Sequence, residues 1–278
     1  MGTLDGKVAL VTGAANKRSM GHEIVLRLAS EGAKIIVVDK EPNPKSLFPG
    51  DENWGGMDEV VSEVKSAGSD ALGLAADISK SKEVDDVIEK AVQKFGKVDI
   101  LVHCAAIRGP VSTAVTELPE DEWKLILDVN TTGTFLIARA VAKQMIAKGE
   151  GGKIVLFASL AGKKGVPGSV AYCVSKWGVI GLAKTMSLEL AQYNIYVNTI
   201  CPGAIITNLR DNAFAKMGKD QGISTEEARQ ADYKKFGAAI PLGRLGTPQD
   251  IADLVYFLAS DQSNYITGEA IVIGGGVT

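Results

Sequence analysis

The stretch that decides the fold reads Val8-Ala-Leu-Val-Thr-Gly13, then Ala14-Ala-Asn-Lys-Arg-Ser-Met-Gly-His22, and, one helix length later, Ile35-Ile-Val-Val-Asp39. The two apolar runs are short and nearly continuous, as strands buried on both faces are. Between them a turn of small residues leads into a helix that we expect to begin near Met20. A strand, a turn, a helix and a second strand predict a right-handed crossover in a parallel sheet.

The same alternation of strands and helices continues to the end of the chain. Further strands are predicted at Ala71–Ala76, Ile100–His103, Lys153–Ala158, Ile195–Ile200 and Ala270–Ile273, with helices such as Glu83–Phe95 and Glu120–Ala147 between them. We therefore expect one α/β domain over residues 1–278, a Rossmann-type doubly wound parallel sheet of about seven strands with helices on both faces. Ligands bind such sheets beyond the carboxyl ends of the strands.

Composition narrows the class of protein. Over 278 residues the formal net charge is −3, and acidic and basic residues are mixed throughout, so a nucleic-acid partner is not expected. The apolar runs are too short to span a membrane, and the N-terminus does not resemble a signal peptide. Three scattered cysteines and two histidines form no disulfide framework or metal-binding pattern. We expect a cytoplasmic protein with no membrane partner and no metal.

The loop after the first strand has the features of a phosphate-binding turn. Gly13, Ser19, Met20 and Gly21 lie where a strand passes into a helix N-terminus, whose free backbone N–H groups bind phosphate. The pattern G-x-G-x-x-G is absent, so this turn alone could equally be a small-residue turn that packs a helix on a sheet.

Asp39 strengthens the interpretation of this loop as a dinucleotide site. It ends the second strand, eighteen positions after Gly21, where an acidic residue hydrogen-bonds the adenosine ribose and opposes a 2′-phosphate. We therefore expect NAD as the cofactor. NADP is the alternative, because Lys17, Arg18 and Lys40 could pair with a 2′-phosphate.

A possible catalytic group lies in the second half of the chain. Tyr172 and Lys176 are four positions apart and share one helix face, and Ser159 stands at the carboxyl end of a buried strand. Tyrosine, with a pKa of about 10, is a poor base at neutral pH. A nearby ammonium and the positive nicotinamide would lower that pKa, and Ser159 could hydrogen-bond a substrate oxygen as charge develops on it.

These residues give the sequence a resemblance to the short-chain dehydrogenase/reductase family over essentially the whole chain. Ser159, the Tyr172-x-x-x-Lys176 pair and Asn130 match the family's catalytic tetrad. The resemblance implies that Ser159 orients substrate, Tyr172 is the acid/base, Lys176 binds the ribose and Asn130 holds a water. It also implies further cofactor contacts at Asp77, Ile78, Cys104, Ala105, Pro202, Gly203, Ile205 and Thr207. Homodimers or homotetramers are expected on the same ground.

Two departures from the family pattern are visible. The glycine loop, Gly13-x5-Ser19-x-Gly21, is similar to that of bacterial enoyl-carrier-protein reductases, whose tyrosine and lysine are generally spaced more widely than here. Cys104 replaces an asparagine usual in the family, which puts local cofactor contacts in doubt. We expect interconversion of a secondary alcohol and a ketone. The alternatives are enoyl (C=C) reduction and a dinucleotide-binding regulator without turnover.

Two segments break the regular spacing of the elements. Lys40–Gly56 contains three prolines and begins directly after Asp39, so we interpret it as a cover over the cofactor that buries Leu47, Phe48 and Trp54. A surface loop without a role is the alternative. The segment Leu209–Ala239 should form part of the substrate site, and Ser224-Thr-Glu-Glu227 predicts a helix start within it.

Overall fold

The central sheet has seven strands, and all of them run parallel. In the computed structural model, which describes residues 2–45, 48, 50–109 and 112–278 apart from the side chains at 210 and 212, their order is β3-β2-β1-β4-β5-β6-β7. The strands are β1 Val8–Thr12, β2 Lys34–Asp39, β3 Ala71–Ala75, β4 Ile100–His103, β5 Gly152–Phe157, β6 Ile195–Pro202 and β7 Ala270–Ile273. The predicted Rossmann-type fold is confirmed, and strand order reverses between β1 and β4. Leu47 lies outside the described residues.

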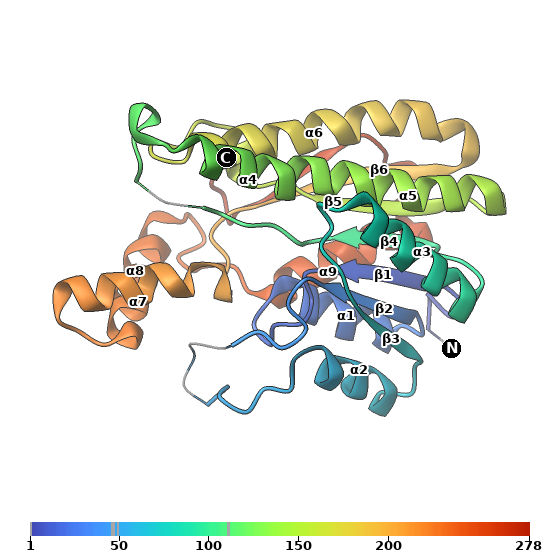
Figure 1. Cartoon of the computed structure of the whole chain (residues 1–278), viewed down its shortest axis with the longest axis horizontal. Helices are drawn as coiled ribbons and strands as arrows, with labels where there is room; N and C mark the ends of the chain where they lie inside the picture. Colours follow the sequence, from blue (N-terminus) through green and yellow to red (C-terminus); the bar gives the residue numbers. More distant parts are fainter. Residues whose placement is uncertain (1, 46–47, 49, 110–111) are drawn as a thin grey trace.

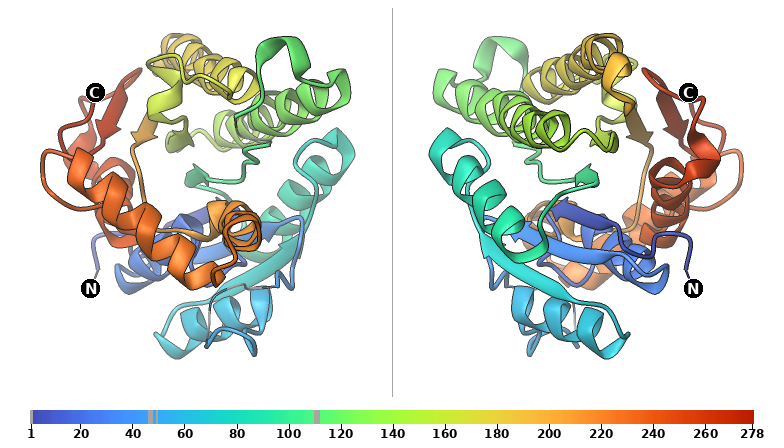
Figure 2. Two further views of the ribbon diagram at one scale, coloured as in Figure 1. Left: turned by 90° about the vertical axis from the view of Figure 1, so that its left-hand side faces the viewer. Right: turned by 90° about the vertical axis from the view of Figure 1, so that its right-hand side faces the viewer.

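Helices cover both faces of this sheet (Figures 1 and 2). They are α1 Met20–Ser30, α2 Gly56–Ser66, α3 Ser81–Phe95, α4 Glu120–Leu127, α5 Gly133–Lys148, α6 Val170–Leu190, α7 Asp211–Gln221, α8 Thr225–Ala239 and α9 Pro248–Ala259. One apolar core lies between the sheet and α3, α5 and α6, and a second lies between the sheet and α1, α2 and α9. The strands inside the sheet are thus buried on two sides, which explains their continuous apolar sequences, whereas the edge strands β3 and β7 are partly exposed.

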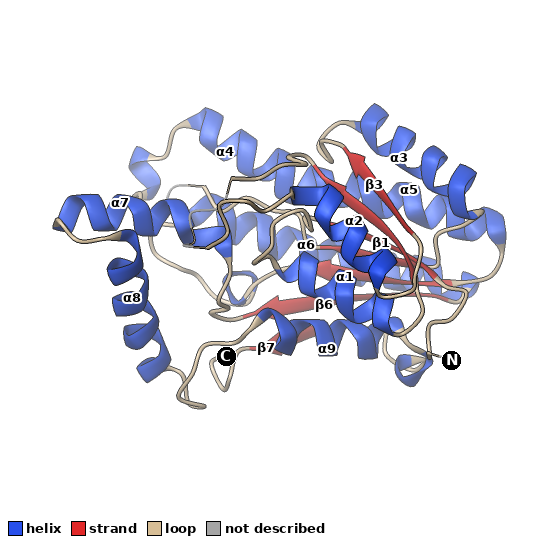
Figure 3. Ribbon diagram, turned by 90° about the horizontal axis from the view of Figure 1, so that it is seen from below, coloured by secondary structure: helices blue, strands red, loops and turns tan. Residues whose placement is uncertain are grey.

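The helices α7 and α8 project from the body of the protein, beyond the carboxyl ends of the strands (Figures 1 and 3). Ser224 caps α8, and its hydroxyl and the Glu227 side chain form a reciprocal capping box. The sequence therefore predicted the start of α8, whereas α7 was not anticipated. The pair stands over the edge of the sheet where ligands bind in this class of fold.

The predicted helix Glu120–Ala147 is interrupted. The chain forms α4, then a π-helical turn over Asp128–Thr132, then α5. A π-turn inserts one residue without changing the apolar pattern enough to be read from sequence. The run Glu120–Lys148 is long and apolar enough to cross a membrane, but it packs on α3, α6 and the sheet. A core helix passes the same test of length and composition, so this is weak evidence for a membrane.

Candidate active site and dinucleotide pocket

A cavity of about 460 Å³ opens where the strand order reverses, at the carboxyl ends of the strands. It brings together residues that lie far apart in the sequence. Of the predicted site residues, Gly13, Ser19, Met20, Gly21, Asp39, Asp77, Ile78, Cys104, Ala105, Tyr172, Lys176 and Thr207 line it. The cavity therefore joins the phosphate loop at one end to the Tyr172–Lys176 pair at the other.

The phosphate loop is closely packed where its glycines lie. Gly13 has φ +70°, and a Cβ there would come within 2.8 Å of the backbone of Ala105. A Cβ on Gly21 would lie 2.4 Å from the carbonyl oxygen of Gly13. Ser19 caps α1 by accepting a hydrogen bond from the His22 N–H, at 3.0 Å. The N-terminus of α1 thus faces the cavity, and side chains at positions 13 and 21 would not fit beside the neighbouring backbone.

Asp39, at the end of β2, lies beside this loop and is held by backbone hydrogen bonds. One carboxylate oxygen accepts from the Ala15 N–H at 3.1 Å, and the other accepts from the Glu41 N–H at 3.2 Å. Burial raises the pKa of Asp39 above its ordinary value, while these two hydrogen bonds oppose the rise. The carboxylate is therefore oriented by the backbone and lines the cavity where the first residues of the 40–56 segment begin.

The cations that could favour a 2′-phosphate are paired with carboxylates. Asp51 receives the Lys17 ammonium at 3.1 Å and the Arg18 Nε at 2.6 Å, and its own side chain is 2% exposed. Lys40 pairs with Asp77 at 2.8 Å. Neither Lys17 nor Arg18 is among the residues that line the cavity.

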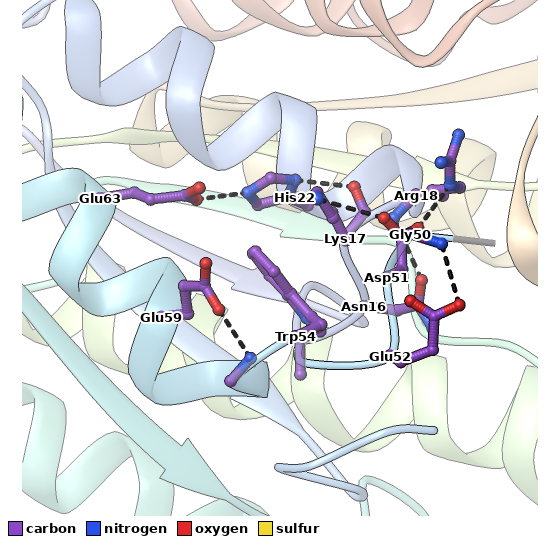
Figure 4. A network of polar contacts seen from close by, with 12 residues as sticks. Asn16, Lys17, Arg18, His22, Gly50, Asp51, Glu52, Trp54, Glu59 and Glu63 are labelled. Carbon is purple, nitrogen blue, oxygen red and sulfur yellow. Dashed lines mark hydrogen bonds and ion pairs between the residues drawn. The ribbon is translucent and has the colours of Figure 1, made fainter. Parts of the chain in front are cut away.

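The 40–56 segment is fastened to the phosphate loop (Figure 4). The Trp54 indole donates to the Ala15 carbonyl oxygen at 2.8 Å, and its ring meets the His22 ring edge-on at 5.2 Å. His22 in turn contacts the Lys17 carbonyl oxygen at 2.9 Å and Glu63 of α2 at 2.6 Å. These contacts mean that the segment supports the loop that begins α1.

The serine, tyrosine and lysine converge at the end of β5. Ser159 follows β5 after Ala158, and its side chain is close enough to Tyr172 for hydrogen bonding that lowers the pKa of the phenol. Tyr172 and Lys176 lie one turn apart on α6, with the Lys176 ammonium 5.6 Å from the centre of the Tyr172 ring. Lys176 donates to the Phe157 carbonyl oxygen at 2.8 Å, which fixes its long side chain against the sheet.

Burial dominates the protonation of these groups. It raises the pKa of Tyr172, although the hydrogen bond from Ser159 and the charge of Arg108 act in the opposite direction. Burial also lowers the pKa of Lys176 to about 8. A nearby ammonium alone would lower the pKa of Tyr172, whereas here the pKa is raised. The reason is that removal from water disfavours the phenolate by more than the nearby charges favour it.

Arg108 is a neighbour of this group that sequence reasoning missed. Its guanidinium lies 6.0 Å from the centre of the Tyr172 ring, on the loop that leaves β4. The only signal in the sequence was its place shortly after a strand end, where ligand-contacting residues gather in this class of sheet.

Asn130 is buried inside the π-turn and does not line the cavity. Its side-chain oxygen accepts from the Ile107 N–H at 2.8 Å, and its amide donates to the Ile107 carbonyl oxygen at 2.8 Å and to the Ser175 hydroxyl at 3.1 Å. Asn130 therefore ties the loop after β4 to α6, next to Lys176. The side chain is fully used in this way, and the Asn130 carbonyl oxygen accepts from the Thr134 hydroxyl at 2.5 Å, so the role of Asn130 in holding a water stays a prediction.

Three predicted cofactor residues lie away from this cavity. Pro202 ends β6 and Gly203 follows it, with the Gly203 N–H donating to the Ile273 carbonyl oxygen at 2.9 Å. Ile205 lines a second cavity and pairs with Gly246. The backbone leaves the sheet after β6 and reaches the main cavity again at Thr207. The strand pattern in the sequence does not show this path.

Cys104 lines the main cavity, and burial strongly raises the pKa of its thiol. It is therefore a neutral thiol where the family usually has an amide. Within the described residues, no group of three or more histidine, cysteine, aspartate or glutamate side chains is placed to hold a metal ion.

A doubly wound sheet, a glycine-lined cavity and a Ser–Tyr–Lys group together define a nicotinamide-dependent oxidoreductase. A family model described as enoyl-(acyl carrier protein) reductase matches residues 13–278. A 3-oxoacyl-(acyl-carrier-protein) reductase of Thermotoga maritima is 35% identical, over 99% of this chain and 98% of that protein. A short-chain type dehydrogenase/reductase from Mycobacterium marinum is similar in structure, with a TM-score of 0.82 at 34% identity over 99% of this chain and 96% of that one.

Carveol dehydrogenase from Mycobacterium avium, solved in complex with NAD, superimposes with a TM-score of 0.86 at 28% identity over 99% of each chain. The chain belongs to the short-chain dehydrogenase/reductase family.

Proposed function

We propose that this protein interconverts a secondary alcohol and a ketone with NAD(H). The observation that carries the proposal is that Tyr172 and Lys176 line the same cavity as Asp39, with Ser159 beside Tyr172. Two of the relatives are named for the reduction of a 3-oxoacyl group and for the dehydrogenation of carveol. Both names describe chemistry between a carbonyl and an alcohol carbon.

The cavity has the groups that a nicotinamide dinucleotide requires. Asp39 would hold the adenosine ribose hydroxyls, Asp77 and Ile78 would flank the adenine, and the start of α1 would hold the pyrophosphate. The close packing at Gly13 and Gly21 leaves the backbone exposed at the point where phosphate must approach. When bound, the cofactor supplies the hydride acceptor or donor.

The chain's own residues would then handle the proton. Tyr172 holds its proton at neutral pH, since burial raises its pKa, so it is suited to donate that proton to a substrate oxygen during reduction. Ser159 already hydrogen-bonds the Tyr172 hydroxyl and would hold the same oxygen in place. In the oxidation direction, the positive charge of the bound cofactor together with Lys176 would favour the phenolate.

NAD is preferred over NADP in this proposal because of charge. Asp39 faces the cavity, and a phosphate dianion beside it would be repelled. Lys17 and Arg18 are directed to Asp51 and Lys40 to Asp77, so each cation already has a carboxylate partner. The NAD complex of the carveol dehydrogenase relative supports the same choice.

Enoyl reduction is the second candidate, because the family model carries that description and the Gly13-x5-Ser19-x-Gly21 loop resembles that of bacterial enoyl-carrier-protein reductases. The single helical turn between Tyr172 and Lys176 favours the alcohol–ketone reaction instead. Absorbance of NADH should separate the two, using a panel of secondary alcohols and ketones, including a 3-oxoacyl thioester, against 2-enoyl thioesters. Turnover of the enoyl substrates alone would refute the proposal, and cofactor binding with no turnover of any of them would favour a regulator.

We also propose a homodimer or homotetramer in the cytoplasm. Trp177 and Leu188 of α6 are 52% and 82% exposed, and Phe135 of α5 is 40% exposed, so two neighbouring helices present apolar side chains to solvent. The three cysteines are free thiols, which fits a reducing compartment. Sedimentation of the wild type and of Leu188→Glu would test the assembly, because a charge within the interface should release monomers.

A further inference from the structure

Three segments that are distant in sequence meet beside the cofactor cavity. They are the phosphate loop at Lys17 and Arg18, the insertion over residues 40–56, and the helix pair α7–α8. Among the described residues of the insertion, Phe48 touches both of the others. Its side chain is 8% exposed although it belongs to a connecting segment. The burial of such a ring in a loop requires partners, and two of them are arginines.

The Phe48 ring is contacted by two guanidinium groups. The central carbon of Arg229 lies 3.6 Å from the ring centroid, and that of Arg18 lies 4.0 Å from it. Both distances are well within the range in which a cation is attracted to an aromatic face. One ring thus links α8, which carries Arg229, to the loop that begins α1, which carries Arg18.

Both arginines are themselves held by carboxylates. Arg18 donates to Asp51 at 2.6 Å, and Asp51 is almost completely buried. Arg229 is 1% exposed and pairs with Asp211 at 3.4 Å and with Glu226. Asp51 belongs to the insertion, as Phe48 does, so Arg18 is joined to the insertion by both residues. Asp211 and Glu226 hold Arg229 within α7–α8, so the Phe48 contacts connect α8 to the insertion and, through Arg18, to the phosphate loop.

The insertion and the residues that lead into α7 also form walls of the cofactor cavity. Pro44 of the insertion lines it, and so do Asn208 and Leu209, which lead directly into α7. A shift of α7–α8 away from the phosphate loop would therefore displace Asn208 and Leu209 from the cavity. The Phe48 contacts therefore join two segments that contribute to walls of this cavity.

We propose that Phe48 is a positioning residue that couples the α7–α8 helices to the phosphate loop through its contacts with Arg229 and Arg18. The consequence for the cofactor rests on the proposed function, whereas the contact itself does not. The coupling is reciprocal: bound NADH steadies α7–α8, and a steady α7–α8 slows NADH release. The competing interpretation is that Phe48 only fills apolar space, which any side chain of similar volume would do.

The test compares Phe48→Leu with Phe48→Tyr. Leucine keeps an apolar side chain and loses the aromatic face, whereas tyrosine keeps the face. Phe95→Leu is the matched control, because Phe95 is also a partly buried ring beside two cations, Lys34 and Lys94, but lies at the end of α3, away from the cavity. Hydrogen exchange of the α8 amides is measured without cofactor, and NADH release is measured by stopped-flow fluorescence.

We expect Phe48→Leu to speed α8 exchange and NADH release by about tenfold, in line with the loss of a desolvated cation–aromatic contact. Phe48→Tyr should stay within about twofold of the wild type, and Phe95→Leu should leave both rates unchanged. Wild-type exchange in Phe48→Leu, or equal defects in the leucine and tyrosine variants, would overturn the proposal. Failure of the wild type to bind NADH would refute the proposed function instead, and α8 exchange would still decide whether the contact couples the segments.

Discussion

Replacing Asp39 with serine should reduce the preference for NADH over NADPH. The Asp39 carboxylate is fixed by the Ala15 and Glu41 N–H groups and faces the cavity, so it cannot turn away from a phosphate on the adjacent ribose. Two unit charges about 4 Å apart repel by about 1 kcal/mol in bulk water and about 4 kcal/mol near a protein surface.

The size of the effect follows from that repulsion. A phosphate with about 1.5 to 2 negative charges would raise the cost to at least about 2 kcal/mol, which corresponds to about a 30-fold weaker binding of NADPH. Lys17, Arg18 and Lys40 offset little of this cost, since Asp51 and Asp77 already hold them. The wild type should therefore bind NADH at least about 30-fold more tightly than NADPH.

Fluorescence titration of both reduced cofactors provides the assay, and it needs no knowledge of the substrate. Asp39→Ser should bring the two dissociation constants to within about fivefold of each other, mainly by strengthening NADPH binding. Asp70→Ser removes an equal charge that pairs with Lys94 outside the cavity, so it should leave the ratio as in the wild type. Tighter binding of NADPH than NADH by the wild type would refute the reasoning.

Three other changes test the site. Tyr172→Phe should lower kcat by about 10²–10⁴-fold with little change in NADH affinity, and a loss below tenfold in steady-state kinetics would remove Tyr172 from its role. NADH affinity should fall above pH about 8, where Lys176 loses its proton, because the ammonium is present only below its pKa; Lys176→Met should abolish that step in titrations. Replacing Asn43–Asn53 with a short Gly/Ser connection should raise the NADH dissociation constant and speed its release, and wild-type release in stopped-flow fluorescence would show that the segment does not cover the cofactor.

Much of this site could be predicted from local features of the chain. A buried parallel strand has an apolar sequence of its own, so all seven strands were placed to within two residues at each end. Asp39 closes one such strand, and Tyr172 and Lys176 lie one helical turn apart, so their placement follows from the period of the helix. These features are encoded over a few consecutive residues.

Features that depend on contacts between distant segments could not be predicted in the same way. The π-turn around Asn130 adds a residue without altering the apolar periodicity, so it is visible only in the backbone. The direction of the Tyr172 pKa depends on how completely the phenol is removed from water.

The sequence by itself determined the parallel sheet and predicted the phosphate loop and the Ser–Tyr–Lys group, because each follows from periodicity or short spacing. The tertiary structure alone decided that Lys17 and Arg18 turn to Asp51, and that Phe48 meets Arg229. An ion pair or a ring contact leaves no periodic trace in the chain, since its energy depends on where two separate segments come to lie. That these cations pair with carboxylates is therefore visible only in the fold.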